Sequence, residues 1–310
     1  MRFLFLFTFS CSSVLCWISG DELSNKVDNF FAHSRHTNNW AVLVCSSRFW
    51  YNYRHVANVL SFYHSIKRLG IPDSNIIVML ADQIPCNPRN PDPATIYNNA
   101  YHHSNLFSED VEVDYRGYEV SAENLVRLLT GRVLPSTPRN KKLLSDRQSN
   151  VLLYLSGHGG DGFLKFQDAE ELTSVDLADA IETMFQHNRY NELFVISDTC
   201  QSESILVGED SLSHHVDRSI GVYIIDRYPY YIQQFLEGRV RNLESNTSMA
   251  EYVKACGTSQ CISTVGLRAD LYEKPLDSVP VTDFFGSQRY IKKIDDALYS
   301  QEDLDFILAQ

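Results

Sequence analysis

Two apolar stretches, NVLLYLSGHGG at residues 150–160 and ELFVISDTCQ at residues 192–201, decide the fold. Each has the length and composition of a buried strand, and each ends near a reactive side chain, His158 in the first and Cys200 in the second. In an open sheet of parallel strands, the carboxyl ends lie at one edge, where ligands bind. The pattern therefore predicts that His158 and Cys200 meet at that edge, where an imidazole can take the proton of a thiol.

The alternative is that His158 and Cys200 have only structural roles. A lone histidine after a strand often is, and a single cysteine after an apolar run is usually a buried core thiol. His158 is flanked by Gly157, Gly159 and Gly160, which let backbone approach a ligand closely. The joint occurrence of this turn and Cys200 favours a nucleophilic site.

The rest of the chain alternates between strand-like and helix-like segments. Further apolar strand candidates lie at residues 40–46, 75–81 and 220–225, and apolar residues at helical spacing lie at 53–69, 122–130 and 174–187. Apolar strands alternating with amphipathic helices are typical of a mostly parallel sheet covered on both faces. We therefore predict a three-layer α/β/α sandwich. Residues 134–150 are expected to form a surface loop, and residues 227–290 an irregular annex whose packing the sequence does not assign.

Length and composition fit one catalytic domain. The chain has 310 residues, 44% of them hydrophobic, which is enough for one sizeable core. Its formal net charge of -12 is spread along the sequence. Nucleic acid is therefore not expected as a partner. The domain is expected over residues 21–290, followed by an acidic tail at 291–310.

The first twenty residues differ in kind from the rest. Met1 and Arg2 precede an apolar run at 3–18 that is shorter than a bilayer span and ends in Ser19 and Gly20. These features predict a cleaved secretory signal at residues 1–20, with a buried N-terminal helix as the alternative. Residues 21–310 contain no second apolar run of membrane-spanning length. The mature chain is therefore expected to be lumenal or secreted, without a transmembrane helix, and to reach a membrane only through partners.

Cysteine usage fits an oxidising compartment. Two of the seven cysteines, Cys11 and Cys16, lie in the predicted signal. Of the other five, Cys45 is expected in the core, and Cys256 and Cys261 are close enough for a local disulfide, although a metal site or two thiols are alternatives. Cys86 lies among prolines and should be exposed. It could bridge to another chain or be an ordinary surface thiol. The lumenal sequence also carries a glycosylation acceptor at Asn246.

Several further motifs carry a family resemblance. These are SGHGG (156–160), SDTCQ (197–201), HTNNWAV (36–42), RFWYNYRH (48–55), PCNPRNP (85–91) and GEDSLSH (208–214). They resemble the catalytic subunits of glycosylphosphatidylinositol (GPI) transamidases, which are legumain-like cysteine peptidases. The similarity runs from about residue 25 to about residue 290 and implies a caspase-like fold, in agreement with the α/β prediction above.

The resemblance implies acyl transfer at the endoplasmic reticulum lumen. Cys200 would attack the attachment-site carbonyl of a proprotein and form a thioester as the C-terminal signal leaves. His158 would accept and return the proton, oriented by Asn52. Backbone N–H groups of Gly159 and Cys200 would bind the oxyanion. The phosphoethanolamine amine of the GPI lipid would then take the acyl group.

The same resemblance implies further contacts. Ser211 and Ser213 would contact substrate, and Cys86 would join a partner subunit of a transamidase complex by a disulfide. The chemistry requires no cofactor, but Asp73, the Ile76 carbonyl, Glu112 and Asp114 match a structural calcium site. From the residues alone, ordinary surface carboxylates are the commoner case.

The chain departs from the family pattern just after Cys200. Family members usually carry about fifteen more residues before the GEDS segment, within the length of a functional loop. Many also carry a C-terminal membrane helix, whereas this sequence ends in a polar stretch with Glu302, Asp303 and Asp305. Two alternatives to the transamidase therefore stay open: a legumain-like endopeptidase of the secretory pathway, and a catalytically impaired assembly subunit.

Overall fold

The computed structural model of the chain describes residues 36–99, 102, 104–200, 212–263 and 265–287. The predicted signal at 1–20 and the predicted acidic tail at 291–310 lie outside these residues. So does Ser211, one of the two predicted substrate contacts.

The described chain is built on a five-stranded sheet in which every neighbouring pair of strands is parallel. The strand order is β3 (Tyr115–Arg116), β2 (Ile76–Leu80), β1 (Asn38–Cys45), β4 (Ser149–Ser156) and β8 (Glu192–Asp198). Four of these strands match the predicted apolar runs. β3 was not predicted, because it has only two residues.

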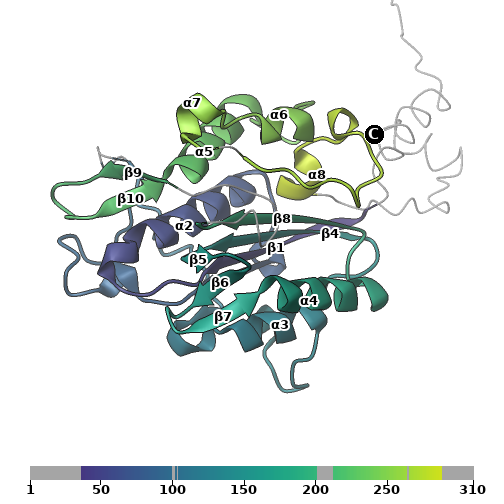
Figure 1. Cartoon of the computed structure of the whole chain (residues 1–310), viewed down its shortest axis with the longest axis horizontal. Helices are drawn as coiled ribbons and strands as arrows, with labels where there is room; N and C mark the ends of the chain where they lie inside the picture. Colours follow the sequence, from purple (N-terminus) through teal and green to yellow (C-terminus); the bar gives the residue numbers. More distant parts are fainter. Residues whose placement is uncertain (1–35, 100–101, 103, 201–211, 264, 288–310) are drawn as a thin grey trace, which may run out of the picture. The chain divides into compact units, whose positions relative to one another are not determined.

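Both faces of the sheet are buried, as the continuous apolar strands predicted. Alternate side chains of β1 enter two different clusters: Ala41, Leu43 and Cys45 on one face, and Trp40, Val42 and Val44 on the other. Helices α2 (Tyr53–Arg68) and α5 (Arg227–Arg239) cover the first face, and α3 (Ala122–Thr130) and α4 (Ser174–Gln186) cover the second (Figure 1). The predicted three-layer α/β/α sandwich is therefore confirmed.

The helices begin and end where their capping residues require. The Ser121 side chain accepts a hydrogen bond from the Asn124 N–H at the start of α3, and Gly131 ends that helix in the left-handed conformation (φ 73°). α4 begins with a capping box between Thr173 and Asp176. Short 3-10 turns complete the connections: η1 (Trp50–Asn52), η2 (Asp73–Asn75), η3 (Ile84–Cys86), η4 (Gly117–Glu119), η5 (Arg139–Lys141) and η7 (Leu276–Ser278).

The strand predicted at residues 220–225 forms, but outside the central sheet. It is β10 (Tyr223–Asp226), which pairs antiparallel with β9 (Ser213–Val216) in a separate two-stranded sheet. A third, antiparallel sheet follows the end of β4 and contains β5 (Gly159–Gly160), β6 (Phe163–Phe166) and β7 (Glu170–Thr173). Both small sheets lie at the end of the central sheet where β4 and β8 terminate (Figure 1).

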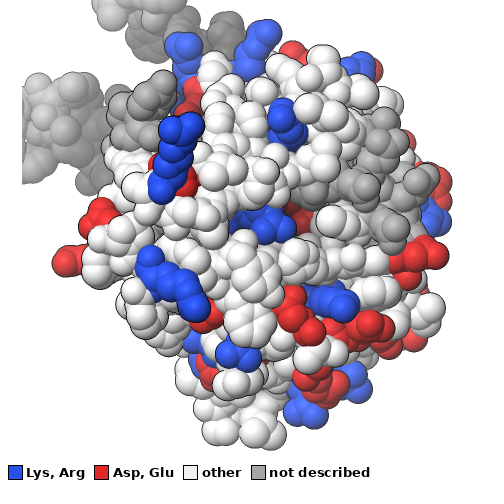
Figure 2. All heavy atoms as spheres, turned by 60° about the vertical axis from the view of Figure 1, so that its left-hand side comes forward, with Lys and Arg blue, Asp and Glu red and all other residues white. Residues whose placement is uncertain are grey.

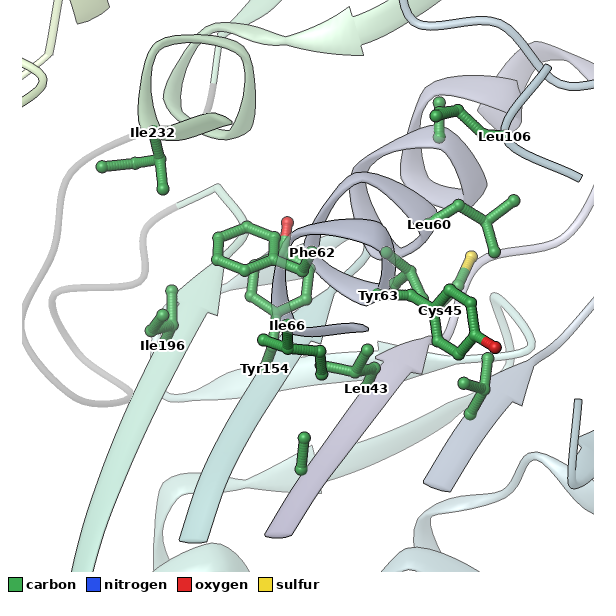
Figure 3. Close-up of a cluster of buried hydrophobic side chains, with 14 of the residues drawn as sticks. Leu43, Cys45, Leu60, Phe62, Tyr63, Ile66, Leu106, Tyr154, Ile196 and Ile232 are labelled. Carbon is green, nitrogen blue, oxygen red and sulfur yellow. The ribbon is translucent and has the colours of Figure 1, made fainter. Parts of the chain in front are cut away.

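Residues beyond α5 share the core of the sandwich. α6 (Met249–Val253), α7 (Thr258–Cys261) and α8 (Thr282–Phe285) follow α5, and buried side chains of α6 and α8 join the cluster beneath α2. In this cluster Phe62 stacks on Tyr154 with ring centroids 4.0 Å apart (Figure 3). The buried amide of Asn39 donates to the Gly286 carbonyl at 2.6 Å, and that of Asn150 donates to the Asp283 carbonyl at 3.0 Å. Two strand amides thus hold α8 against β1 and β4.

The described cysteines differ in environment. Cys45 is buried, and burial raises the pKa of its thiol to about 12. Cys256 and Cys261 form a disulfide with their Cα atoms 5.6 Å apart, and Cys86 is exposed. Within the described ranges, no helix is both long enough and apolar enough to cross a membrane.

Candidate active site

Strand register brings His158 and Cys200 to the same edge of the sheet. β4 and β8 are parallel neighbours, and Ser156 lies opposite Asp198. His158 and Cys200 each follow these partners by two residues, so the two strands deliver them side by side. The Gly157 N–H donates to the Asp198 carbonyl at 3.4 Å and extends the pairing to the site. Cys200 is exposed, so a substrate carbonyl can reach its thiol.

Asn52 orients the imidazole of His158. The Asn52 Oδ1 atom lies 2.7 Å from His158 Nε2, and the Asn52 amide nitrogen donates to the Arg48 carbonyl at 2.6 Å. Because the Asn52 amide nitrogen is committed to that carbonyl, the amide oxygen faces the histidine and accepts a hydrogen bond from Nε2–H. This arrangement assigns the proton to Nε2. The other ring nitrogen, Nδ1, is then left without a proton and with a lone pair that can accept one.

The surroundings of His158 keep its ring neutral. Burial is the main cause that lowers the pKa of His158 below its usual value, and the charge of Arg54 adds to it. Carboxylates of Asp168 and Asp226 oppose this shift. The ring also meets the His55 ring edge-on, with centroids 5.3 Å apart. The charged and titratable groups around His158 are Arg54, His55, Lys165, Asp168 and Asp226.

We expect the acidic limb of the pH–rate profile to lie below the usual histidine pKa of 6.5. An imidazole whose pKa is lowered stays unprotonated, and so able to accept a proton, as the pH falls through that value. Initial rates of acyl transfer measured between about pH 5 and 8 would check this. An acidic limb whose midpoint lies above about pH 7 would contradict this expectation.

Gly159 brings a second backbone segment against Thr199 and Cys200. A Cβ atom at Gly159 would lie 2.3 Å from Thr199 Oγ1 and 3.3 Å from the Cys200 carbonyl oxygen, so a side chain does not fit there. The two predicted oxyanion donors, the N–H groups of Gly159 and Cys200, therefore belong to adjacent backbones. Their role remains a prediction.

Comparison with known proteins agrees with this geometry. Residues 39–221, which include Asn52, His158 and Cys200, match the model of the Peptidase C13 family. The chain belongs to the peptidase C13 family. It is 51% identical over 305 residues to the GPI-anchor transamidase of Homo sapiens, covering 94% of this chain and 76% of that protein. It is 48% identical over 285 residues to that of Schizosaccharomyces pombe, covering 87% and 75%. A Drosophila melanogaster protein given the same name provisionally is 56% identical over 307 residues, covering 93% and 85%.

A buried polar network, which the sequence did not reveal, underlies this C13 site. The Asn58 amide nitrogen lies 2.6 Å from Asp226 Oδ2, 3.2 Å from Ser156 Oγ and 3.3 Å from Asp198 Oδ2, and its two hydrogens are shared among these three acceptors. The Tyr154 hydroxyl also donates to Asp198 Oδ2, at 2.7 Å. All of these side chains are buried. The network ties the strand that carries Cys200 to α2 and to the β9–β10 hairpin.

Arg54 supplies the cation of this network. Its Nε donates to Asp226 Oδ1 at 3.1 Å, with the Asp226 side chain only 1% exposed. Burial raises the pKa of Asp226, while Arg54 and Asn58 oppose the rise. Arg54 lies in the RFWYNYRH motif and Asn58 lies three residues after it, so the sequence drew attention to this segment. It did not indicate that Asp226 is the long-range partner of both residues.

The predicted substrate contact Ser213 lies at the start of β9, directly opposite Asp226 in the hairpin. Its hydroxyl hydrogen-bonds to the Asp226 carboxyl group. Ser213 is half-buried. The hydrogen bond links Ser213 to the same buried network as the strand end before Cys200. Substrate contact by Ser213 stays a prediction.

The four predicted calcium ligands lie around the start of β2 and the end of its following loop. The carboxylate of Asp73 is engaged by Lys67 and by the Tyr63 hydroxyl, and that of Asp114 accepts hydrogen bonds from the Val78 N–H and the Asn140 amide. Burial raises the pKa of Asp114 to about 6. Among the described residues, no group of three or more His, Cys, Asp or Glu side chains is placed to hold a metal ion. The ion would have to displace Lys67 from Asp73, and the site stays a prediction.

Figure 2 turns toward the viewer the side of the molecule where the sheet strands end. On the described part of this face, basic and acidic side chains are interspersed over a largely uncharged surface. No continuous basic patch is seen among those described residues.

Proposed function

We propose that the chain is the catalytic subunit of a GPI-anchor transamidase, with Cys200 as the nucleophile. The observation that carries the proposal is the parallel register of β4 and β8, which delivers His158 and Cys200 to one edge. The hydrogen bond of 2.7 Å between His158 and Asn52 supports it. Relatives from animals and yeast that carry the name GPI-anchor transamidase match most of the chain.

In the first half-reaction, the Cys200 sulfur attacks the carbonyl carbon of the attachment-site residue. His158 Nδ1 takes the thiol proton as the sulfur–carbon bond forms, and the resulting imidazolium is stabilised by Asn52 through Nε2–H. The N–H groups of Gly159 and Cys200 bind the oxyanion. His158 then gives its proton to the leaving amine, the peptide bond breaks, and the thioester remains on Cys200.

In the second half-reaction, the primary amine of the GPI phosphoethanolamine attacks the thioester. His158 takes a proton from the amine, and the carbon–sulfur bond breaks as the new amide forms. The thiolate of Cys200 then regains its proton. With these two substrates, the chain would work at the endoplasmic reticulum lumen together with other transamidase subunits, and the exposed Cys86 would join one of them by a disulfide.

The proposal is tested by complementation. Cells that lack their own catalytic transamidase subunit retain GPI precursors without attached protein, and expression of this chain is expected to restore a GPI-anchored reporter to the cell surface. Failure of the wild-type chain, although folded and present in the lumen, would overturn the proposal. Electrophoresis of the same membranes without reductant shows whether Cys86 carries a partner.

The same assay separates the transamidase from the plain endopeptidase. Water can replace the lipid amine in the second half-reaction, and the reporter would then be cleaved and released without an anchor. Peptide cleavage by the isolated chain, with no anchored product in cells, would favour the endopeptidase.

A further inference from the structure

Phe49 holds a backbone conformation that side chains rarely adopt. Its φ is 76° and its ψ is 152°, a region essentially restricted to glycine. Phe49 is 45% exposed. Its ring centroid lies 5.8 Å from that of Tyr51 and 5.4 Å from Cζ of the Arg48 guanidinium. Burial of the ring therefore does not account for the conformation. Such strain persists only where neighbouring groups impose it, and it is concentrated at functional sites.

Two carboxylates from separate elements impose the conformation. The Phe49 N–H donates to Asp82 Oδ2 at 2.8 Å, and the Arg48 N–H donates to Asp168 Oδ2 at 3.2 Å. Asp82 lies just after β2, and Asp168 lies in the turn between β6 and β7. Hydrogen bonds from backbone N–H groups to charged carboxylates are among the stronger ones in proteins. The two aspartates therefore fix the peptide groups on either side of Arg48 from two directions.

The peptide group between Arg48 and Phe49, which Asp82 fixes, and the peptide group that follows it both hold Asn52. The Arg48 carbonyl accepts the Asn52 side-chain amide at 2.6 Å, and the Phe49 carbonyl accepts the Asn52 N–H at 3.0 Å. A relaxed φ at Phe49 would turn the Arg48 carbonyl relative to the Phe49 carbonyl, so Asn52 could no longer bond to both in its present position. The Asn52 Oδ1 atom would then lose its direction toward His158.

We propose that Asp82 is a positioning residue, which holds Phe49 in its strained conformation and thereby points the Asn52 amide oxygen at His158. Asp168 assists it from the opposite side. The inference rests on the proposed roles of Asn52, His158 and Cys200. It adds a residue to which the family resemblance assigned no role.

The test measures the thiolate of Cys200 directly. Membranes that contain the full chain are treated with iodoacetamide across a range of pH, and alkylation of the Cys200 peptide is followed by mass spectrometry. Loss of the Asn52 contact destabilises the imidazolium that accompanies the thiolate, so Asp82→Ala should shift the alkylation curve to higher pH by about one unit. At a pH well below both midpoints, this corresponds to an alkylation rate about tenfold lower. Asp82→Asn keeps an oxygen acceptor and should change the rate less than about threefold.

Rescue by glycine distinguishes positioning from a general structural role. Phe49→Gly in the Asp82→Ala background should restore the rate to within about threefold of wild type, because glycine adopts positive φ without the strain. Phe49→Leu in the same background loses the ring but stays strained, and should not restore it. Equal rates in the two double variants, or an unchanged rate in Asp82→Ala, would overturn the proposal. Asp270→Ala, at an exposed position, controls for loss of a negative charge.

The wild-type curve separates this inference from the proposed function. In one outcome, Cys200 of the wild-type chain titrates as an ordinary thiol with a midpoint of about 8.5, and His158→Ala does not move that midpoint. The assignment of His158 and Cys200 as the catalytic pair is then wrong, and so is the positioning role of Asp82. If the wild-type thiol is activated and Asp82→Ala leaves it activated, only the role of Asp82 is wrong.

Discussion

Replacing Cys200 with alanine is expected to reduce anchor attachment by at least about 1,000-fold. The proposed reaction has no second nucleophile, because the thioester on Cys200 is the only link between cleavage of the proprotein and attack by the lipid amine. Cys200→Ser should lose about as much, since a hydroxyl beside a neutral imidazole is a far weaker nucleophile than a thiol. Attachment is measured as the amount of GPI-anchored reporter formed in membranes from complemented cells.

The stability of the chain serves as the control for this variant. Cys200 is exposed, so its truncation removes little packing, and the melting temperature should stay close to that of the wild type. The assignment of Cys200 as the nucleophile would be wrong if the Cys200→Ala chain folds normally and still forms more than about a tenth of the wild-type amount of GPI-anchored reporter. That result, with no labelling of Cys200 by an active-site thiol probe in the wild type, would support the assembly subunit instead.

The central sheet could be predicted because its signals are local. Each long strand is a continuous apolar run, and the helix between the first two strands shows apolar residues at regular spacing over four turns. The prediction for α3 matched its ends, Ala122 and Thr130, because Gly131 supplies an unambiguous stop. Parallel strand ends then fix His158 and Cys200 at one edge without further information.

The hairpin and the small antiparallel sheet could not be predicted in the same way. Their strands have two to four residues, which is too short for any periodicity, and β10 looks like another buried strand of the main sheet. Its antiparallel partner β9 is polar, with His214 and His215 at its centre. Only the pairing itself shows that this segment lies outside the parallel sheet.

The supporting groups of the site were missed for a different reason. Asn58 and Asp226 are separated by 168 residues, and no local pattern marks one as the partner of the other. The same holds for Asp82 and Asp168, which reach the Arg48–Phe49 segment from loops. Asn52 was found because the family resemblance named it, whereas the residues that hold it were reached only through the folded geometry.

Replacing Arg54 with methionine is expected to lower the free energy of unfolding by about 3 kcal/mol at neutral pH. Arg54 is the cation that faces the buried carboxylate of Asp226, with an Nε to Oδ1 distance of 3.1 Å. Methionine keeps much of the side-chain volume but leaves that charge without its partner. The carboxyl group can respond by taking up a proton. Its folded-state pKa then lies further above the unfolded value of 3.8, so the destabilisation should shrink as the pH falls and grow as it rises.

Urea denaturation of the two matched charge variants measures this effect. Arg268→Met breaks a pair that is exposed on both sides, with Arg268 63% and Asp270 55% accessible, and should leave stability unchanged within error. Asp226→Asn added to Arg54→Met removes the unpaired charge and should recover at least half of the loss, because the penalty comes from the buried carboxylate and not from the missing guanidinium. An Arg54→Met chain as stable as Arg268→Met, or a double variant less stable than Arg54→Met alone, would show that the buried ion pair does not hold the hairpin to α2.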